Sequence, residues 1–164
     1  MSFLHLFGVS SGMPRFFACL LSLWVALPTW AAGDIATYVV VDSDYSATRD
    51  ALLEVIEAEG LVVGAILPFN QMLQRTGGDR AETPFQKAEI VQFCSSALAW
   101  QMVQEAPEQL ALCPISIAIY NRVAGDQVTL AYRRPGDGTP GRRQAADLLG
   151  RIARRTVELA RLRW

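Results

Sequence analysis

Two cysteines, Cys94 and Cys113, are the residues of this sequence best suited to chemistry. Cys94 stands in "VQFCSSALAW", between a strand-like run and the predicted first turn of a helix, and Cys113 stands in "LALCPIS". A thiol just ahead of a helix is favoured as the thiolate by the positive end of the helix dipole and by unpaired backbone N–H groups. Such a thiolate could exchange with disulfides, or bind a soft metal such as Cu(I) with Met72 or Met102 as thioether ligands.

Three hypotheses for these cysteines are open. A disulfide between Cys94 and Cys113 would stabilise the fold by about 3 kcal/mol on the chain-entropy model. If the strands that flank them run parallel, however, the cysteines lie at opposite ends of strands about 15 to 20 Å long, whereas a bridge needs Cα atoms within about 7 Å. A reactive Cys94 is the second hypothesis, although no Cys-x-x-Cys pair supports it. The third is an inert thiol, because free cysteine is commonly buried.

Residues 1–31 form a predicted secretory signal peptide. Arg15 is followed by the apolar run "FFACLLSLWVAL" and by small residues up to Ala31, which is the typical order of a cleavable signal. We expect cleavage after Ala31 or one residue later. An uncharged stretch precedes Met13, which favours Met13 as the true start.

Export leaves residues 32–164 as a single domain without histidine. Pro28 interrupts an apolar run shorter than the about 20 residues that a membrane span needs, so we expect a periplasmic or secreted protein with no stable membrane insertion. His5 and Cys19 leave with the signal peptide. Without imidazole, nucleophile pairs of the Ser-His-Asp or Cys-His type and most zinc or non-haem iron sites are excluded. We therefore predict no catalytic residue, no bound metal and no cofactor, and favour a non-enzymatic protein.

Charge is divided between two parts of the mature chain. Residues 32–121 hold 12 acidic and 4 basic residues, whereas residues 122–164 hold 4 acidic and 10 basic ones. A nucleic-acid-binding domain is expected to be basic overall, so we predict no nucleic-acid partner. The Arg-rich C-terminal segment is expected to face the acidic first helix of its own chain or of a partner chain.

The hydrophobic pattern predicts eight helices and strands. Ser46 is expected to cap the first helix and Gly60 to end it, while the stretch after Phe69 is expected to be a loop with about one helical turn. In chain order the pattern predicts a strand over 37–43, a helix over 46–59, a strand over 61–69 buried on both faces, a strand over 86–93, a helix from 95 or 96 to the residue before Pro107, strands over 112–122 and 127–135, a flexible stretch over 136–143 and a helix over 144–162. The order β-α-β-β-α-β-β-α favours an α+β two-layer sandwich, a mostly antiparallel sheet with helices on one face.

Three stretches resemble one family in the right order and at plausible spacing. They are "GLVVGAILPFNQMLQRTG", "KAEIVQFCSSALAWQMVQEAPEQLALCPISIAIYNR" and "VTLAYRRPG", and they are similar to the domain of unknown function 302 family over about 100 residues of the chain. One branch of that family has a Phe-Cys-Ser stretch followed by a Cys-Pro pair, which Phe93, Cys94, Ser95, Cys113 and Pro114 match. A commoner branch has Leu-Pro-Cys there, and this chain has Ile115 in place of that cysteine. The resemblance implies a small α+β domain, a homodimer and no agreed activity.

Two further groups of residues are candidate binding sites. Arg133 and Arg134 end a strand beside two glycines, which is suited to an anion such as phosphate, a carboxylate or a sulfur oxyanion; the alternative is a solvated strand end. The stretch "FNQMLQRTGG" could close over a ligand groove, or else pack in the core or a dimer interface. Its candidate groove residues are Phe69, Met72, Thr76 and Gly77.

Three functions follow from these residues. The favoured one is an exported, non-enzymatic domain that binds a small molecule or an envelope protein as a homodimer, with an apolar pocket near Phe69. The second is a thiol-dependent redox or Cu(I)-handling protein centred on Cys94. The third is a structural module of an envelope complex, which would show a large apolar surface patch instead.

Overall fold

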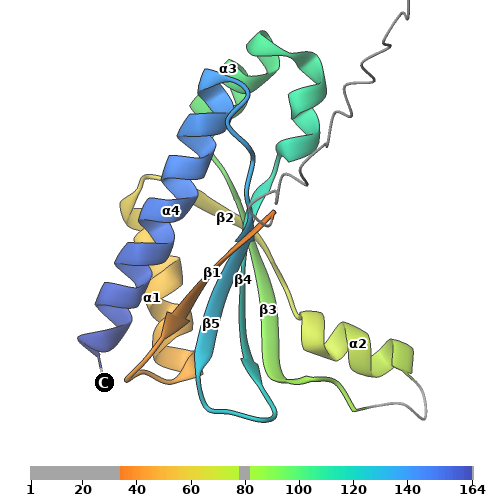
Figure 1. Cartoon of the computed structure of the whole chain (residues 1–164), viewed down its shortest axis with the longest axis vertical. Coiled ribbons are helices and arrows are strands. Elements are labelled where there is room, and N and C mark those ends of the chain that lie inside the picture. Colours follow the sequence, from red (N-terminus) through yellow and green to blue (C-terminus); the bar gives the residue numbers. More distant parts are fainter. Residues whose placement is uncertain (1–33, 78–81, 164) are drawn as a thin grey trace, which may run out of the picture. The chain divides into compact units, whose positions relative to one another are not determined.

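The computed structural model describes residues 34–77 and 82–163. The predicted signal peptide, the Met13 start and Cys19 lie outside these residues. In chain order the elements are β1 (Ile35–Val40), α1 (Tyr45–Ala58), β2 (Val62–Leu67), α2 (Phe69–Gly77), β3 (Phe85–Cys94), α3 (Ser96–Glu105), the 3₁₀ helix η2 (Pro107–Leu112), β4 (Ile115–Arg122), β5 (Val128–Arg133) and α4 (Pro140–Arg161) (Figure 1).

The five strands form one antiparallel sheet in the order β1-β5-β4-β3-β2. The predicted α+β sandwich is thereby confirmed. β2 is an edge strand that pairs with β3 alone, so the prediction that it is buried on both faces is wrong. Its first residue, Val62, is 76% exposed. An apolar run indicates a strand, but it does not show whether that strand lies in the middle of a sheet or at its edge.

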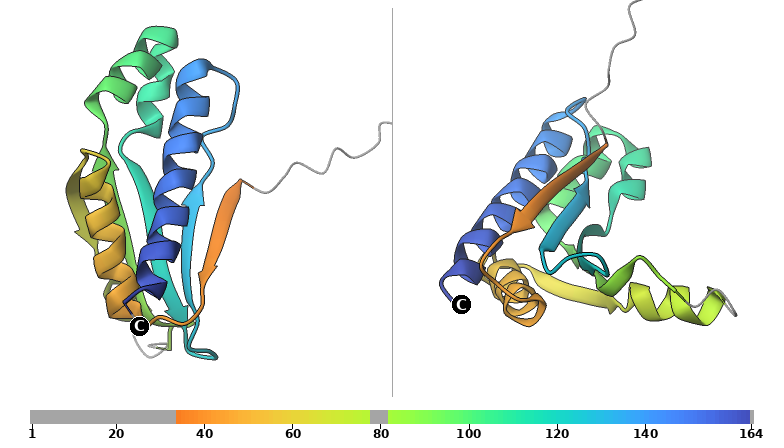
Figure 2. Two further views of the ribbon diagram at one scale, coloured as in Figure 1. Left: turned by 90° about the vertical axis from the view of Figure 1, so that its left-hand side faces the viewer. Right: turned by 60° about the horizontal axis from the view of Figure 1, so that its bottom comes forward.

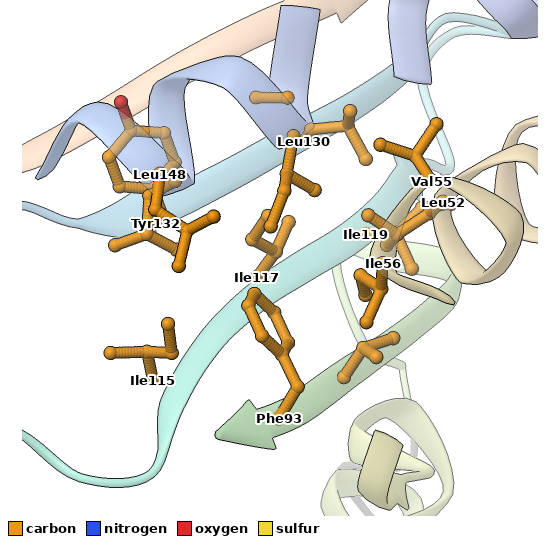
Figure 3. Close-up of a cluster of buried hydrophobic side chains, with 14 of the residues drawn as sticks. Leu52, Val55, Ile56, Phe93, Ile115, Ile117, Ile119, Leu130, Tyr132 and Leu148 are labelled. Atoms are coloured by element: carbon orange, nitrogen blue, oxygen red, sulfur yellow. The ribbon is translucent and has the colours of Figure 1, made fainter. Parts of the chain in front are cut away.

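One face of the sheet carries the hydrophobic core. α1 and α4 lie side by side over this face, as the left view of Figure 2 shows. Leu52, Val55 and Ile56 on α1 recur at helical spacing, and they meet alternate residues of the strands, which point to the same side of a sheet. Figure 3 shows these core side chains, among them Phe93, Ile117, Ile119 and Leu130, which are at most 1% exposed.

Charged side chains join α1 to α4. Arg155 Nη1 lies 2.6 Å and Arg151 Nη2 lies 3.6 Å from the Glu59 carboxylate. Arg163 pairs with Glu54 in the same way. The expectation that the Arg-rich segment faces the acidic first helix is therefore confirmed within one chain.

Two helices begin earlier than predicted. Asp44, not Ser46, caps α1, and its carboxylate accepts a hydrogen bond of 2.8 Å from the Ala47 amide. Thr139 caps α4 and Pro140 occupies its first turn, so the stretch expected to be flexible contains the helix start. A capping threonine followed by proline is a helix-start signal that the glycines around it obscured.

α3 and η2 carry the chain from β3 to β4 beyond the ends of these strands, at the top of Figure 1. η2 begins with Pro107 in its first turn and takes in Leu112, so that β4 starts at Ile115, three residues later than predicted. The Glu105 carboxylate anchors this excursion to α4 by accepting two hydrogen bonds, of 2.8 and 3.0 Å, from the Gly141 amide. Hydrogen bonds, first from Thr139 and also from Gly141, lower the pKa of Glu105.

The other face of the sheet is not covered by α1 or α4. Strand register and the alternation of side chains place small and apolar residues on it, including Ile35, Val39, Ile90, Ala118 and Ala131. Ile35 and Val39 are exposed, and a shallow hollow of about 160 Å³ lies around Ala118 and Ala131. We refer to these five residues and their surroundings as the open face.

Among the described residues, no helix is long and apolar enough to cross a membrane.

Candidate functional site

The stretch after β2 forms a helix rather than the predicted loop. α2 projects from the sheet, as Figure 1 and the right view of Figure 2 both show. Its first turn is held by the buried side chain of Asn70, whose Nδ2 donates a hydrogen bond of 3.0 Å to the Gln86 carbonyl of β3. The Thr83 hydroxyl donates to Asn70 Oδ1. A helix this short is marginal alone, so these contacts decide that it forms.

A groove of about 500 Å³ lies where α1, α2 and β3 meet. Most of its lining residues are polar, whereas we expected an apolar pocket at this end of the chain. The lining residues are Tyr45, Ser46 and Arg49 from α1, Pro68 just before α2, Asn70, Gln71 and Gln74 from α2, and Gln86, Lys87, Ala88 and Glu89 from β3. Because these segments are distant in sequence, only the folded chain assembles the groove.

The Tyr45 hydroxyl is the most unusual group in this groove. Tyr45 is 8% exposed, and its hydroxyl makes no hydrogen bond of normal geometry, although the Glu89 carboxylate lies close enough to act on it. Burial raises its pKa, and the nearby Glu89 carboxylate raises it further. The hydroxyl therefore stays protonated at neutral pH and is available as a donor. Buried polar groups are nearly always hydrogen-bonded, and the Glu89 carboxylate is the acceptor that lies beside this hydroxyl.

Two cations and one anion lie around Tyr45. Arg49 Nε donates a hydrogen bond of 2.6 Å to Glu89 Oε2, and both side chains are partly buried. Lys87 Nζ lies 5.3 Å from the centroid of the Tyr45 ring, at the distance of a cation–π contact. Since Arg49 neutralises Glu89, Lys87 leaves the groove with a net charge of +1. Together with the carboxamides of Gln71, Gln74 and Gln86, it presents mainly donors to a small oxyanion.

The groove residues predicted from the sequence lie on α2, but not on the side of that helix that lines this groove. Phe69, Met72, Thr76 and Gly77 all belong to α2, but none of them lines the groove. Met72 is 44% exposed, and the Thr76 hydroxyl donates to the Met72 carbonyl within the helix. The residues on the lining side of α2 are Asn70, Gln71 and Gln74. The available signal was a polar Asn directly after the predicted strand over 61–69.

The two cysteines lie together at the opposite end of β3. β3 and β4 run antiparallel, with Phe93 paired to Ile115, so the parallel arrangement that argued against a disulfide is wrong. Cys94 ends β3 and Cys113 stands two residues before Ile115, so antiparallel pairing puts both at the same end of the sheet. Both thiols are free, Cys94 is exposed and Cys113 is half-buried. Burial raises the pKa of Cys113, and the charge and hydrogen bonding of Cys94 raise it further.

The proposed thioether ligands are not gathered around these thiols. β2 runs from Val62, which pairs with Cys94, to Leu67, which pairs with Ile90. α2 follows Leu67, so Met72 lies at the other end of the sheet. Met102 is buried in α3, beside Gly141 of α4. Within residues 34–77 and 82–163, no three His, Cys, Asp or Glu side chains are placed to hold a metal ion.

The arginine pair lies at the cysteine end of the sheet. Arg133 ends β5, and Arg133 and Arg134 line a small cavity of about 150 Å³ with Pro114 and Ser116. The Arg134 amide donates a hydrogen bond of 2.7 Å to the Asp34 carbonyl, which closes the strand end. The cavity could take a small anion, but it is less than a third of the volume of the polar groove.

Comparison with known proteins agrees with the geometry. The model of the domain of unknown function DUF302 matches residues 37–156. The chain belongs to the DUF302 family. A crystal structure of an uncharacterized conserved DUF302 protein from Bacillus stearothermophilus is similar, with a TM-score of 0.58 and 16% identity over 79% of this chain and 97% of that one. No curated protein matches. The resemblance seen in the sequence is thereby confirmed, and at this identity the DUF302 structure supports the fold alone.

Proposed function

We propose that the chain is an exported, non-enzymatic domain that binds a small organic anion in the polar groove and pairs as a homodimer. The observation that carries the binding proposal is the groove itself, in which Lys87, the Tyr45 side chain and the Arg49–Glu89 ion pair converge. Ligand sites combine a concave surface with a few convergent polar groups and perturbed titratable residues. The predicted signal peptide supports export to the periplasm or the medium.

The chemistry of the groove limits the ligand. Tyr45, Lys87 and the carboxamides are donors that match carboxylate oxygens, while the carboxamide oxygens can accept from a hydroxyl or amino group. A small hydroxy acid or amino acid with one or more carboxylates has these features. Citrate and L-glutamate are suitable probes, and glucose is an uncharged control of similar size.

The Tyr45→Phe variant separates binding from folding. We expect the affinity for the carboxylate probe that binds to fall about tenfold, because one hydrogen bond to a charged acceptor is lost, which is roughly 1.4 kcal/mol. Stability in urea should change by less than about 1 kcal/mol, because the hydroxyl makes no hydrogen bond of normal geometry in the folded chain. Titration followed by amide NMR measures the first effect and urea unfolding the second.

Tyr120→Phe is the matched control, because Tyr120 lies on β4 outside the groove. Loss of the Tyr120 hydroxyl should leave the titration unchanged. Amide shifts should cluster at α1, α2 and β3. Absence of shifts there with either carboxylate up to about 10 mM, a concentration that detects Kd values in the millimolar range, would contradict the binding proposal.

The open face supports the homodimer. Five strands about 4.8 Å apart and about 20 Å long give a face of roughly 400 to 500 Å² in projection. Side chains make the accessible surface larger than this projected area, so two copies together would bury close to the roughly 1,200 Å² of a small stable interface. Its centre is uncharged, and Arg122 and Arg133 stand at its two ends. A second copy of the chain is therefore the occupant that we propose, and an envelope protein is the alternative.

The Ala131→Glu variant tests this interface. Ala131 is central in the open face, so a buried, unpaired carboxylate there should convert the dimer to a monomer at micromolar concentrations. Sedimentation equilibrium gives the mass. Ala58→Glu adds the same charge at an exposed position of α1 and should leave the dimer intact. A monomeric parent protein would refute the homodimer and favour another partner for this face.

A further inference from the structure

The Cys94–Cys113 pair is independent of the polar groove, because it lies at the other end of β3. Two features of the fold bring the thiols together. The α3–η2 excursion begins directly after Cys94 and ends directly before Cys113, and antiparallel pairing returns β4 alongside β3. Cys94 and Cys113 are not directly paired, but they follow the last pair of these strands, Phe93 with Ile115, at the same end of the sheet. The Cys94 thiol is near enough to act on Cys113 through its charge and a side-chain hydrogen bond, and a disulfide needs such an approach of the two side chains.

The two thiols differ in their surroundings. Cys94 is exposed and stands just ahead of the N-cap Ser95 of α3. Cys113 is half-buried and packs against the core beside Leu112. A reagent from solvent therefore meets Cys94 first. Burial and the neighbouring Cys94 raise the pKa of Cys113, which suits it to react second, with a sulfur atom already beside it.

We propose that Cys94 and Cys113 form a reversible intramolecular disulfide by exchange with a small-molecule disulfide. In the first step the Cys94 thiolate attacks one sulfur of the disulfide RSSR, which forms the mixed disulfide of Cys94 with RS and releases RS⁻. In the second step Cys113 loses its proton to solvent and attacks Cys94 Sγ, which breaks the mixed bond and releases a second RS⁻. The protein dithiol is oxidised by two electrons and RSSR is reduced to two thiols.

The bridge would tie the α3–η2 excursion to the sheet at both of its ends. The same excursion is joined to α4 by Glu105 at Gly141 and by the buried Gln109, whose Oε1 accepts a hydrogen bond of 3.2 Å from the Thr139 hydroxyl. Oxidation would therefore restrict one contiguous unit of the fold, α3, η2 and the start of α4. The polar groove, formed by α1, α2 and β3, would keep its lining.

The test uses the complete chain with Cys19→Ser, purified as the cell processes it, so that Cys94 and Cys113 are the only thiols counted. The protein is equilibrated with mixtures of reduced and oxidised glutathione, quenched in acid and alkylated under denaturing conditions. Its intact mass is then measured by mass spectrometry. We expect a monomer lighter by two hydrogens with no alkylated thiol at high oxidised glutathione, and two alkylated thiols after dithiothreitol. Intermediate mixtures should give both forms.

Single variants assign the two roles. The Cys113→Ser variant should stop at the mixed disulfide, with one glutathione on Cys94. The Cys94→Ser variant should take up glutathione at least about tenfold more slowly, because its remaining thiol, Cys113, is half-buried. Cys113→Ala replaces Cys113→Ser if the serine variant does not fold. The proposal is overturned if the parent protein keeps two titratable thiols, binds glutathione separately on each, or forms only a disulfide between chains. Faster glutathionylation of Cys113 than of Cys94 would overturn the assigned order.

Discussion

Phe93→Ala is expected to lower the free energy of unfolding by about 3 to 5 kcal/mol. Phe93 is 1% exposed, lies on the core face of β3 and is paired with Ile115. The truncation removes most of a large side chain from a site enclosed by the sheet and the helices (Figure 3), and a cavity there can collapse only in part. Small domains are stable by about 5 to 15 kcal/mol in total, so a large part of the folded state's stability is lost.

Urea unfolding followed by circular dichroism measures this loss. Phe93→Leu fills most of the same volume and is expected to lose less than half as much. Val62→Ala is a control on β2, since its exposed side chain buries little apolar surface. A loss below about 1 kcal/mol for Phe93→Ala would contradict the placement of Phe93 in the core, because such losses are typical of surface sites.

Asn70→Ala is expected to release α2 while the rest of the fold stays intact. The variant removes the donor to the Gln86 carbonyl and the acceptor for Thr83, which are two of the contacts that hold this short helix against β3. Losing a buried hydrogen bond typically costs about 1 to 3 kcal/mol when a partner is left unsatisfied. Amide exchange in α2 should therefore accelerate about 10- to 100-fold. Global unfolding in urea should change far less.

Hydrogen exchange resolved by residue makes the measurement. Arg75→Ala is the matched control, because Arg75 is exposed in the same helix and does not line the groove. If α2 wall residues bind the ligand, Asn70→Ala also weakens binding of the carboxylate probe. Unchanged exchange in α2 would show that contacts other than Asn70 hold the helix.

Local patterns in the sequence were sufficient for the kinds of element and most of their order. Alternating and helical spacings of apolar residues are set by the geometry of strands and helices themselves, so β1, α1, β3, α3, β5 and α4 could be recognised without knowledge of their neighbours. The opposite charges of α1 and α4 likewise predicted that these helices face one another. α2 was missed because its helix depends on Asn70 and a distant strand.

For the two candidate sites, too, some features follow from the sequence and others only from the tertiary structure. The sequence by itself determined that no histidine remains after residue 5, that two cysteines flank one helical segment, and that the family is DUF302. Only the tertiary structure decided that β3 and β4 run antiparallel, which places Cys94 near Cys113. It also decided that Tyr45, Lys87 and the Arg49–Glu89 pair share one groove. Both outcomes depend on how distant segments pair, and pairing is set by the packing of the whole core rather than by any local pattern.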